Sequence, residues 1–397
     1  MNTTGDRIAR ARRRRGLSQP ILAGLVGRSE SWLSQVERGV RHIDSHTVLV
    51  KLAEVLRVDL EELTGEEKTG DGRPRFSARV EIEQAMMRYD AIESSISPGR
   101  RKSRYDLAAL SQQVDLMYGL YQATRYAEVG RALPRLIGQV EAAARGRGAD
   151  ACAVRAWVYN VTAALLQRIG EPALAWTAAD RSVSAAEQSE QPLLIAVATY
   201  RLAYVFTSMN RPQAAAHLAT GAATALERKS PSSPDHLSVY GGLLLAAATA
   251  TAAEFDSSAT ARYLADARRV AERLGSDLNL MGTAFGSINV AVHTMSTAVT
   301  MGDAQTAIEI GEELEVAEMP AGLVGRRTQV LLDLARAYAM RRQDAAAVNT
   351  LLKAEDASPQ LVRYNDHTRD LLADLLRREH RASTPQLRPL ARRAGVI

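Results

Sequence analysis

The clearest chemistry in the sequence lies in residues 19–39, where two short helices are predicted on either side of a tight turn. Ser18 and Ser29 each stand where a helix begins, and a serine hydroxyl there accepts a hydrogen bond from an unpaired first-turn amide. Gly27 supplies the break between the helices, and Gly39 ends the second one as a left-handed C-cap. We therefore expect a helix-turn-helix in this segment.

The second helix of this pair is expected to present polar side chains to another molecule. Leu33 and Val36 should face inward, because they fall at helical spacing. Gln35 has the best chemistry for reading a sequence, since its planar amide can pair with both edge groups of adenine, worth about 1–3 kcal/mol against a wrong base. The side chains expected on the outer side of the helix are Glu30, Ser31, Trp32, Ser34 and Gln35. This pattern favours a helix that enters a groove of double-stranded DNA.

Two of these side chains have more than one role open to them. Glu30 can accept a hydrogen bond from a cytosine amino group, or it can stabilise the helix N-terminus through the helix dipole. Trp32 can contact a thymine methyl group or a backbone sugar, or it can pack on the preceding helix or on a dimer partner. We favour packing for Trp32 and leave both roles of Glu30 open.

Positive charge is concentrated around this helix pair. Residues 1–41 hold nine arginines and three acidic residues, a balance of +6, whereas the whole chain carries +5. A basic end on a nearly neutral chain is expected of a protein that meets phosphate at one end only. We expect Arg28, Arg38 and Arg41 at the DNA, the last two on phosphates. One or two arginines of the run at 12–15 are expected to join them.

The remaining residues near the N-terminus predict the helices that pack around the pair. A helix is expected over residues 6–15, with Ile8 and Ala11 inward, another over 46–56 and a short one over 58–63. The apolar face of the first helix of the pair is expected to consist of Ile21, Leu22, Leu25 and Val26.

The same segment resembles a known family of regulators. Leu17-Ser18-Gln19 and the ending LSQVERG of residues 33–39 are similar to the XRE group, which is related to the phage Cro and cI repressors. The resemblance covers residues 5–65. It implies a five-helix DNA-binding domain over residues 1–65, in which Gln19 braces a phosphate or a base edge.

Beyond residue 65 the composition of the chain changes twice. Residues 66–104 are predicted to be a linker with one helix near 77–96, because the flanking stretches are rich in glycine, proline and charge. From Tyr105 onward almost every segment favours helix. Breaks recur at intervals of roughly 40–47 residues, which is typical of stacked helix pairs. They lie at Ala123-Thr124, Gly170-Glu171-Pro172, Asn210-Arg211-Pro212, Phe255-Asp256, Gly302-Asp303 and Gln343-Asp344.

Each break is followed by a helix rich in small residues. These units are similar to degenerate tetratricopeptide repeats and predict an α-solenoid over residues 105–397 in an all-α chain. The combination resembles the peptide-sensing RRNPP regulators and the XRE/repeat regulators common in actinobacteria, and residues 283–293 (TAFGSINVAVH) resemble a recurrent element of the latter. The positions predicted to lie where one helix crosses the next are Ala175, Ala215, Ala307 and Ala347.

The first helices of the repeat units are expected to line a concave surface. Amide side chains there can donate and accept hydrogen bonds along a peptide backbone, or hold a small polar ligand. Residues 278–302 carry no charge, which indicates dry surroundings in a core or a closed ligand cavity. Two interpretations stay open: contact with a small-molecule or peptide effector, and satisfied polar groups between packed helices. The residues concerned are Trp157, Asn160, Tyr200, Tyr204, Phe285, Asn289 and His293.

Catalytic and metal-binding patterns are missing from the sequence. It has no GxxxxGK, HExxH or GxSxG motif, and its seven histidines are scattered without ligand spacing. The single cysteine, Cys152, excludes an internal disulfide and suits a reducing cytosol. We therefore expect a cytoplasmic, non-enzymatic protein that needs no cofactor or metal and enters no membrane.

Together these features predict a transcriptional regulator that binds an operator of two half-sites as a homodimer. One short module buries too little surface for tight binding alone. A ligand in the concavity would change the relative placement of the two DNA-binding domains. The alternative is a DNA-tethered scaffold whose repeats dock a protein partner. It would expose the concave residues in an open groove, whereas a sensor encloses them. Use of the domain in an antitoxin or on RNA fits this chain length poorly.

Overall fold

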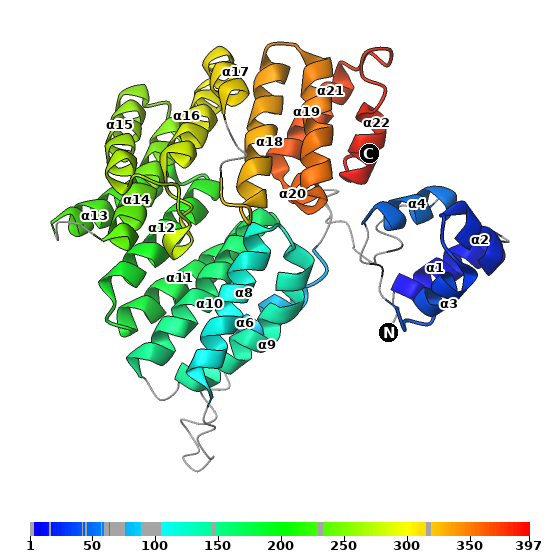
Figure 1. Cartoon of the computed structure of the whole chain (residues 1–397), viewed down its shortest axis with the longest axis horizontal. Coiled ribbons are helices and arrows are strands. Elements are labelled where there is room, and N and C mark those ends of the chain that lie inside the picture. The colour runs from blue at the N-terminus through cyan, green and yellow to red at the C-terminus, as the bar shows by residue number, and fades with distance from the viewer. Residues whose placement is uncertain are drawn as a thin grey trace.

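The structure is a computed structural model, and it describes residues 4–15, 17–41, 43, 46–56, 58, 63, 76–88, 105–144, 148–228, 233–314 and 319–397. Every regular element within these residues is helical, which confirms the predicted all-α class. Figure 1 shows two groups of helices: a small group near the N-terminus and a large array that contains the later helices.

The N-terminal group packs its described helices around one apolar core. Ile8, Leu22, Leu33 and Leu52 have no exposed surface, and Leu63 is buried with them. The predicted fifth helix, over residues 58–63, lies mostly outside the described residues. Only residues 58 and 63 of that segment are described. The helices are α1 (Thr4–Arg14), α2 (Gln19–Leu25), α3 (Glu30–Glu37) and α4 (His46–Leu56).

The turn between α2 and α3 forms as the sequence predicts. Ser18 Oγ accepts a hydrogen bond from the Ile21 amide at 3.4 Å, and Ser29 Oγ accepts one from the Trp32 amide at 3.2 Å. Gly27 has a φ of +70°, in the left-handed region that favours glycine. The two helices are therefore separated by a short reversal with both starts capped.

The apolar face predicted for α2 is wrong in half of its residues. Leu22 and Val26 are buried, but Ile21 and Leu25 expose 53% and 50% of their surface. The helix has only 7 residues and buries a single narrow stripe. Ile21 and Leu25 each precede a stripe residue by one position, a rotation of about 100° around the helix, and so face outward.

The helix expected within residues 66–104 packs against the large array. It is α6 (Arg79–Met87), which is shorter than the sequence predicts. Phe76, just before it, lies against Gly130, where an added Cβ would be 2.5 Å from the Phe76 ring. Ile82 is fully buried in the same cluster. Residues 64–75 and 89–104 lie outside the described residues.

The large array is built from antiparallel helix pairs, and each predicted break lies between the two helices of one pair. The helix contacts follow the chain order, each helix packing on the next, as stacked pairs require. The pairs are α8 (Leu107–Gln122) with α9 (Tyr126–Ala144), α10 (Ala149–Arg168) with α11 (Pro172–Gln188), α12 (Pro192–Ser208) with α13 (Pro212–Glu227), α14 (Pro234–Ala253) with α15 (Ser257–Leu274), α16 (Ser287–Met301) with α17 (Ala304–Glu313), and α18 (Val324–Met340) with α19 (Asp344–Ala357).

The turns inside the pairs share one backbone design. Each contains a left-handed residue, and the next amide donates a hydrogen bond to the carbonyl five residues earlier, which satisfies an orphan carbonyl at the helix end. The Arg125 amide, for example, bonds the Leu120 carbonyl at 2.9 Å. The left-handed residues are Thr124, Gly170, Asn210, Phe255, Gly302 and Arg342.

The small residues predicted at the helix crossings are completely enclosed. Ala175, Ala215, Ala307 and Ala347 each have 0% exposed surface. A side chain of this size lets the backbones of two helices approach closely, whereas a larger one would force them apart. The sequence prediction of these packing positions is therefore confirmed.

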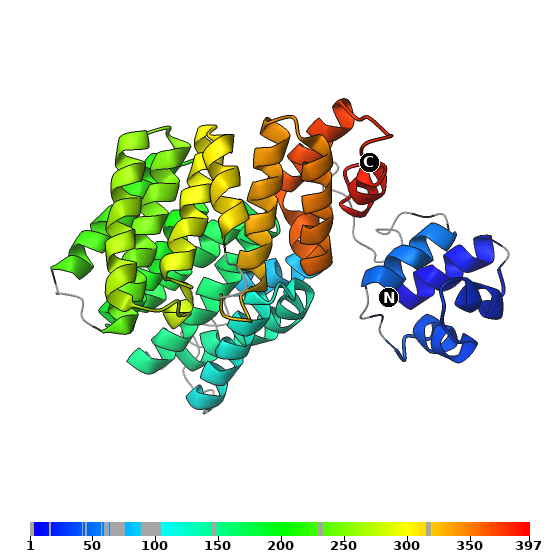
Figure 2. The ribbon, with the colours of Figure 1, turned by 45° about the horizontal axis from the view of Figure 1, so that its top comes forward.

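The array curves until its last pair meets its first. The inner helices α8, α10, α12, α14, α16 and α18 contact one another in turn, and α18 also contacts α8. At that junction an added Cβ on Gly325 would be 3.1 Å from Thr124 Cγ2. Figure 2 shows the pairs side by side along the array. The helices beyond the last pair are α20 (Pro359–Tyr364), α21 (Asp366–Arg377) and α22 (Leu387–Arg393).

Among the residues that the structure describes, one helix is long and apolar enough to cross a membrane. It is α14, with a mean hydropathy of 1.3, and 83% of the apolar window is buried inside the array. It contacts α12, α13, α15 and α16. Such burial is what a core helix of a helical array requires.

Candidate nucleic-acid interface and effector site

The inner side of α3 is fixed by a buried carboxylate. Arg12 Nε and Nη2 donate hydrogen bonds to Glu37 at 2.7 and 2.8 Å, and Gln19 Nε2 donates another at 2.7 Å. Burial alone would raise the pKa of Glu37, but the hydrogen bonds from Arg12 and Gln19 and the Arg12 charge lower it below its ordinary value. The carboxylate therefore stays charged and joins α1, α2 and α3.

The outer side of α3 presents the predicted reading residues. Glu30 and Ser31 are exposed, while Ser34 and Gln35 are partly buried. No hydrogen bond of the Gln35 side chain is recorded within the described residues, so its amide is available to a partner. Leu33 and Val36 are buried, as predicted.

The predicted basic residues border this surface. Arg38 and Arg41 are exposed at the end of α3, and Arg38 Nε bonds the Ser34 carbonyl at 3.2 Å. The guanidinium of Arg28 lies over the Trp32 ring, 5.7 Å from its centroid. Trp32 is itself half-buried against the core of the domain, which is the packing role favoured from the sequence.

The arginine run of residues 12–15 divides between structural and exposed positions. Arg12 is held by Glu37, and its Nη1 also donates to the Leu17 carbonyl at 2.9 Å. Arg15 Nη1 donates to the Val55 carbonyl of α4 at 2.8 Å. Arg13 and Arg14 are exposed. Sequence reasoning missed the structural role of Arg12, although Glu37 stands four residues after Leu33 and hence on the buried face of α3.

Gln19 is directed inward in this structure. The resemblance to the XRE group implies that it braces a phosphate or base edge, but its Nε2 donates to Glu37. Its other amide proton and its carbonyl oxygen have no recorded bond within the described residues. Gln19 thus links the reading surface to the Arg12–Glu37 ion pair.

The predicted effector residues lie in the interior that the inner helices enclose. Asn160 is 1% exposed and accepts hydrogen bonds from Tyr118 Oη at 2.5 Å and from Arg201 Nε at 3.3 Å. Its Nδ2 donates to the Val197 carbonyl at 3.4 Å. The Trp157 ring meets Tyr118 edge to face, with centroids 5.4 Å apart. These contacts tie α8, α10 and α12 together.

A second group of these residues surrounds His293. Its Nδ1 donates to the Asn289 carbonyl at 2.9 Å, and its Nε2 accepts from Tyr204 Oη at 2.9 Å. Burial and the charge of Arg326 lower the pKa of His293 to about 3, so the imidazole is neutral at pH 7. Asn289 Oδ1 is buried without a hydrogen-bond partner. The Tyr200 ring packs edge to face on Tyr204 at 5.0 Å.

Phe285 has a packing role instead. It is fully buried, and an added Cβ on Gly241 would be 2.0 Å from its ring. After it, Gly286 passes so close to Asp277 that an added Cβ would be 2.2 Å from the carboxylate, which accepts a hydrogen bond from the Ile288 amide. The element at residues 283–293 therefore closes the start of α16 against α14.

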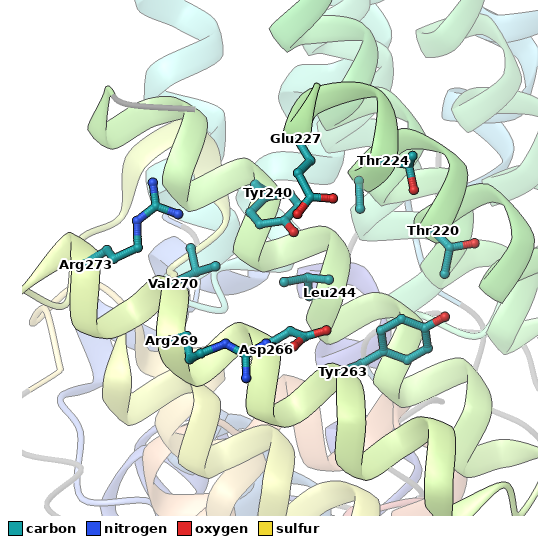
Figure 3. Close-up of a pocket in the computed structure, with 11 residues that line it drawn as sticks. Thr220, Thr224, Glu227, Tyr240, Leu244, Tyr263, Asp266, Arg269, Val270 and Arg273 are labelled. Atoms are coloured by element: carbon teal, nitrogen blue, oxygen red, sulfur yellow. Dashed lines mark hydrogen bonds and ion pairs between the residues drawn. The ribbon is translucent and has the colours of Figure 1, made fainter. Parts of the chain in front are cut away.

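A surface groove that sequence reasoning missed lies between α13 and α15, with α14 as its floor (Figure 3). Its volume is about 790 Å³. Burial and the neighbouring Glu227 carboxylate raise the pKa of Tyr240 in its wall to about 12. Both acidic and basic side chains line it. The lining residues labelled in Figure 3 are Thr220, Thr224, Glu227, Tyr240, Leu244, Tyr263, Asp266, Arg269, Val270 and Arg273.

The described part of the chain has no candidate metal site, because nowhere in it do three His, Cys, Asp or Glu side chains lie close enough to hold an ion. Cys152 is buried and unbridged, with its thiol 3.8 Å from Gln188 Oε1.

Comparisons with known proteins bear on the two parts of the chain separately. A search of curated proteins finds no match. Among solved structures the chain is similar to PlcR from Bacillus thuringiensis in complex with the peptide PapR7 and DNA, with 12% sequence identity, a TM-score of 0.31, and coverage of 98% of this chain and 93% of that one. A family model described as a helix-turn-helix domain matches residues 4–64. Residues 4–64 are therefore a helix-turn-helix domain, as their residue pattern predicts.

Proposed function

We propose that the protein is a cytoplasmic transcriptional regulator that binds a specific DNA sequence through α3. The observation that carries this proposal is the division of α3 into two sides. Its inner side is fixed by the core and the Glu37 carboxylate, whereas Gln35 on its outer side has an amide without a recorded partner. A rigid helix with a free amide beside exposed arginines suits direct readout in the major groove.

Each residue of this surface receives a role from its place. Gln35 and Ser31 read base edges, and Arg38 and Arg41 hold phosphates. Arg28, whose guanidinium packs over the Trp32 ring, is proposed to contact the DNA backbone. Glu30 lies exposed in the first turn of α3, where either of its expected roles operates. Ser34 completes the surface, and Gln19 supports it from within through Glu37.

The functional unit in this proposal is a homodimer on two half-sites. A single helix-turn-helix module buries too little surface for tight and specific binding. Two copies that read half-sites about 10 bp apart double both the contact area and the sequence read. The described helical array supplies the bulk on which such a dimer would form.

The array is proposed to sense a small molecule or peptide. Supporting this, the interior side chains are enclosed: Asn160, Asn289 and His293 are 1%, 1% and 5% exposed. Binding there would change the curvature of the array and hence the spacing of the two DNA-binding domains.

A second candidate is a scaffold that docks a protein partner while the helix-turn-helix domain tethers it to DNA. The groove of Figure 3 favours it, because that surface is open and carries both charges and aromatic rings. The two candidates differ in where ligands act. Substitutions in the groove affect a docked partner, while those in the interior affect an enclosed effector.

Selection of genomic DNA by the purified protein tests the proposal. We expect a small set of fragments to be retained at about 150 mM salt and to share a sequence with two related halves. If all fragments were retained alike, the protein would bind DNA without sequence specificity. If none were retained, the proposal would be wrong.

A further inference from the structure

Three guanidinium groups converge in the interior of the array without a carboxylate to neutralise them. They belong to Arg168 on α10, Arg201 on α12 and Arg326 on α18. Within the part of the chain that the structure describes, none of the three has an ion pair. Arg168 and Arg201 lie on neighbouring inner helices, and the closure of the array brings Arg326 of α18 toward them.

The recorded hydrogen bonds of these arginines go to neutral oxygens. Arg201 is 9% exposed; its Nε donates to Asn160 Oδ1 at 3.3 Å, and its guanidinium lies 5.8 Å from the Tyr200 ring centroid. Arg168 Nη1 donates to Gln329 Oε1 at 3.3 Å. Each guanidinium has five N–H donors, so most of this capacity is not used by these contacts.

Tyr121, on α8, is within the electrostatic influence of all three arginines. Burial raises the pKa of Tyr121, but the charges of Arg168, Arg201 and Arg326 lower it below its ordinary value. A buried phenol normally becomes less acidic. The surroundings of the Tyr121 hydroxyl therefore favour negative charge.

Asp333, which shares the hydrogen-bond partner Gln329 with Arg168, already has partners of its own. Asp333 is 2% exposed and accepts hydrogen bonds from Ser296 and from Gln329, and Arg336 lies 3.6 Å from its Oδ1. It therefore has hydrogen-bonding and ionic partners of its own. Burying guanidinium groups without a counter-charge is costly, and their mutual repulsion adds to that cost.

The side chains of the cluster differ in their exposure to solvent. Arg201 is buried, but Tyr121, Arg168 and Arg326 keep partial exposure. Arg201 is therefore the innermost of the three guanidinium groups. The phenol rings around it supply flat apolar walls beside the charges.

We propose that the interior of the array is an anion-binding site in which Arg168, Arg201 and Arg326 hold the phosphate or carboxylate group of a small effector. This inference rests on the proposed sensing function and names the chemical class of its ligand. Guanidinium groups suit either oxyanion, because their paired N–H donors match two oxygens at once. The bound oxyanion would neutralise the cluster and pull α10, α12 and α18 together.

Thermal unfolding of the full chain in three salts of equal ionic strength tests the proposal. Sodium phosphate and sodium acetate are each compared with sodium chloride, and the arginine variants below separate binding at the site from the general stabilisation that phosphate gives to folded proteins. We expect phosphate, acetate or both to raise Tm above the chloride value, because a ligand that binds only the folded state stabilises it. A rise with phosphate alone that the arginine variants lose assigns a phosphoryl group, and such a rise with acetate assigns a carboxylate. Equal Tm values in all three salts overturn the proposal.

Substitutions connect that shift to the named residues. Arg326→Gln and Arg168→Gln should each weaken the affinity for the stabilising anion by about tenfold, because each variant loses one charge-assisted contact. In chloride they should not lower Tm, because each removes an uncompensated charge. Arg135→Gln, on the exposed surface of α9, is the matched control and should leave the anion effect intact. An anion effect that survives in both variants contradicts the site.

DNA binding is measured separately on the same proteins. If the protein binds its operator but no oxyanion, this inference fails and the proposed regulator stands. If it binds the oxyanion but no DNA fragment, the proposed function fails and the anion site stands.

Discussion

Glu37 holds the reading side of α3 in place, because its carboxylate bonds one side chain from α1 and another from α2. Its side chain is 5% exposed and that of Arg12 is 11% exposed. Glu37→Gln should destabilise the helix-turn-helix domain by about 3 kcal/mol, since it leaves the Arg12 guanidinium buried without its partner. Denaturant unfolding followed by the fluorescence of Trp32, in a chain with Trp157 and Trp176 replaced by phenylalanine, measures the change. Glu30→Gln, at an exposed position of the same helix, should change stability little.

The same carboxylate makes the domain sensitive to acid. Its pKa is lowered in the folded state from the ordinary 4.5. The stabilisation is therefore fully present above pH 4.5 and is lost as the pH falls through the lower, folded value. We expect the denaturant concentration at the midpoint of unfolding to decrease in the native chain as the pH is lowered below 4.5. The same midpoint should depend less on pH in Glu37→Gln. Equal pH profiles would disagree with the assigned ion pair.

Gln35 and Arg38 should separate base reading from phosphate binding. Gln35→Ala should reduce the preference for operator over random DNA by about 1–3 kcal/mol and keep the salt dependence. Arg38→Ala should weaken binding to both DNAs alike and reduce the salt slope by about one. Fluorescence anisotropy titrations at several salt concentrations measure both quantities. The opposite pattern would exchange the two roles.

Single-residue predictions from the sequence succeeded where spacing alone sets the outcome. Leu33 and Val36 are buried because their helical register leaves them no other face. Glu37 was missed, since its partner Arg12 lies 25 residues away and an acid in a core position is interpretable only once both are placed. The exposed Ile21 was misplaced because a short helix buries less than its apolar residues offer.

At the scale of helices, the segment that leads into α16 is held against α14 because the Phe285 ring packs on Gly241. Phe285 fills the space over Gly241, where a Cβ would be 2.0 Å from the ring. Gly241→Ala should destabilise the array by about 1–3 kcal/mol, because the ring must move within a packed core. Gly221→Ala is the matched control: it lies in α13 with nothing within 4 Å, and should stabilise by about 0.5–1 kcal/mol. Thermal unfolding of both variants gives the comparison.

The positions of the pair turns were predictable, but their backbone conformation was less so. Gly170, Asn210 and Gly302 are residues that adopt a positive φ readily, so they mark turns in the sequence. Thr124, Phe255 and Arg342 adopt the same conformation without that preference. In these turns the repeated hydrogen bond and the packing of each helix pair outweigh the cost of a left-handed backbone at these residues. The regular spacing of the breaks along the sequence, rather than the residue type, revealed their positions.

The whole molecule combines a basic domain with an array that closes on itself. Closure follows from a small rotation between successive pairs, summed until α18 meets α8. No single segment encodes that sum, which is why Arg168, Arg201 and Arg326 were not recognised as neighbours in the sequence. The expected concave residues Asn160 and His293 were found, because they follow from counting within one repeat.

The central claim is that α3 reads DNA, and the most direct test is the affinity of the purified full chain for a fragment selected from its own genome. The titration compares this fragment with the same fragment after scrambling one half-site, at about 150 mM salt. Our account predicts at least a tenfold loss on scrambling and binding of two chains per intact fragment. Equal affinity for the intact and scrambled fragments would contradict it.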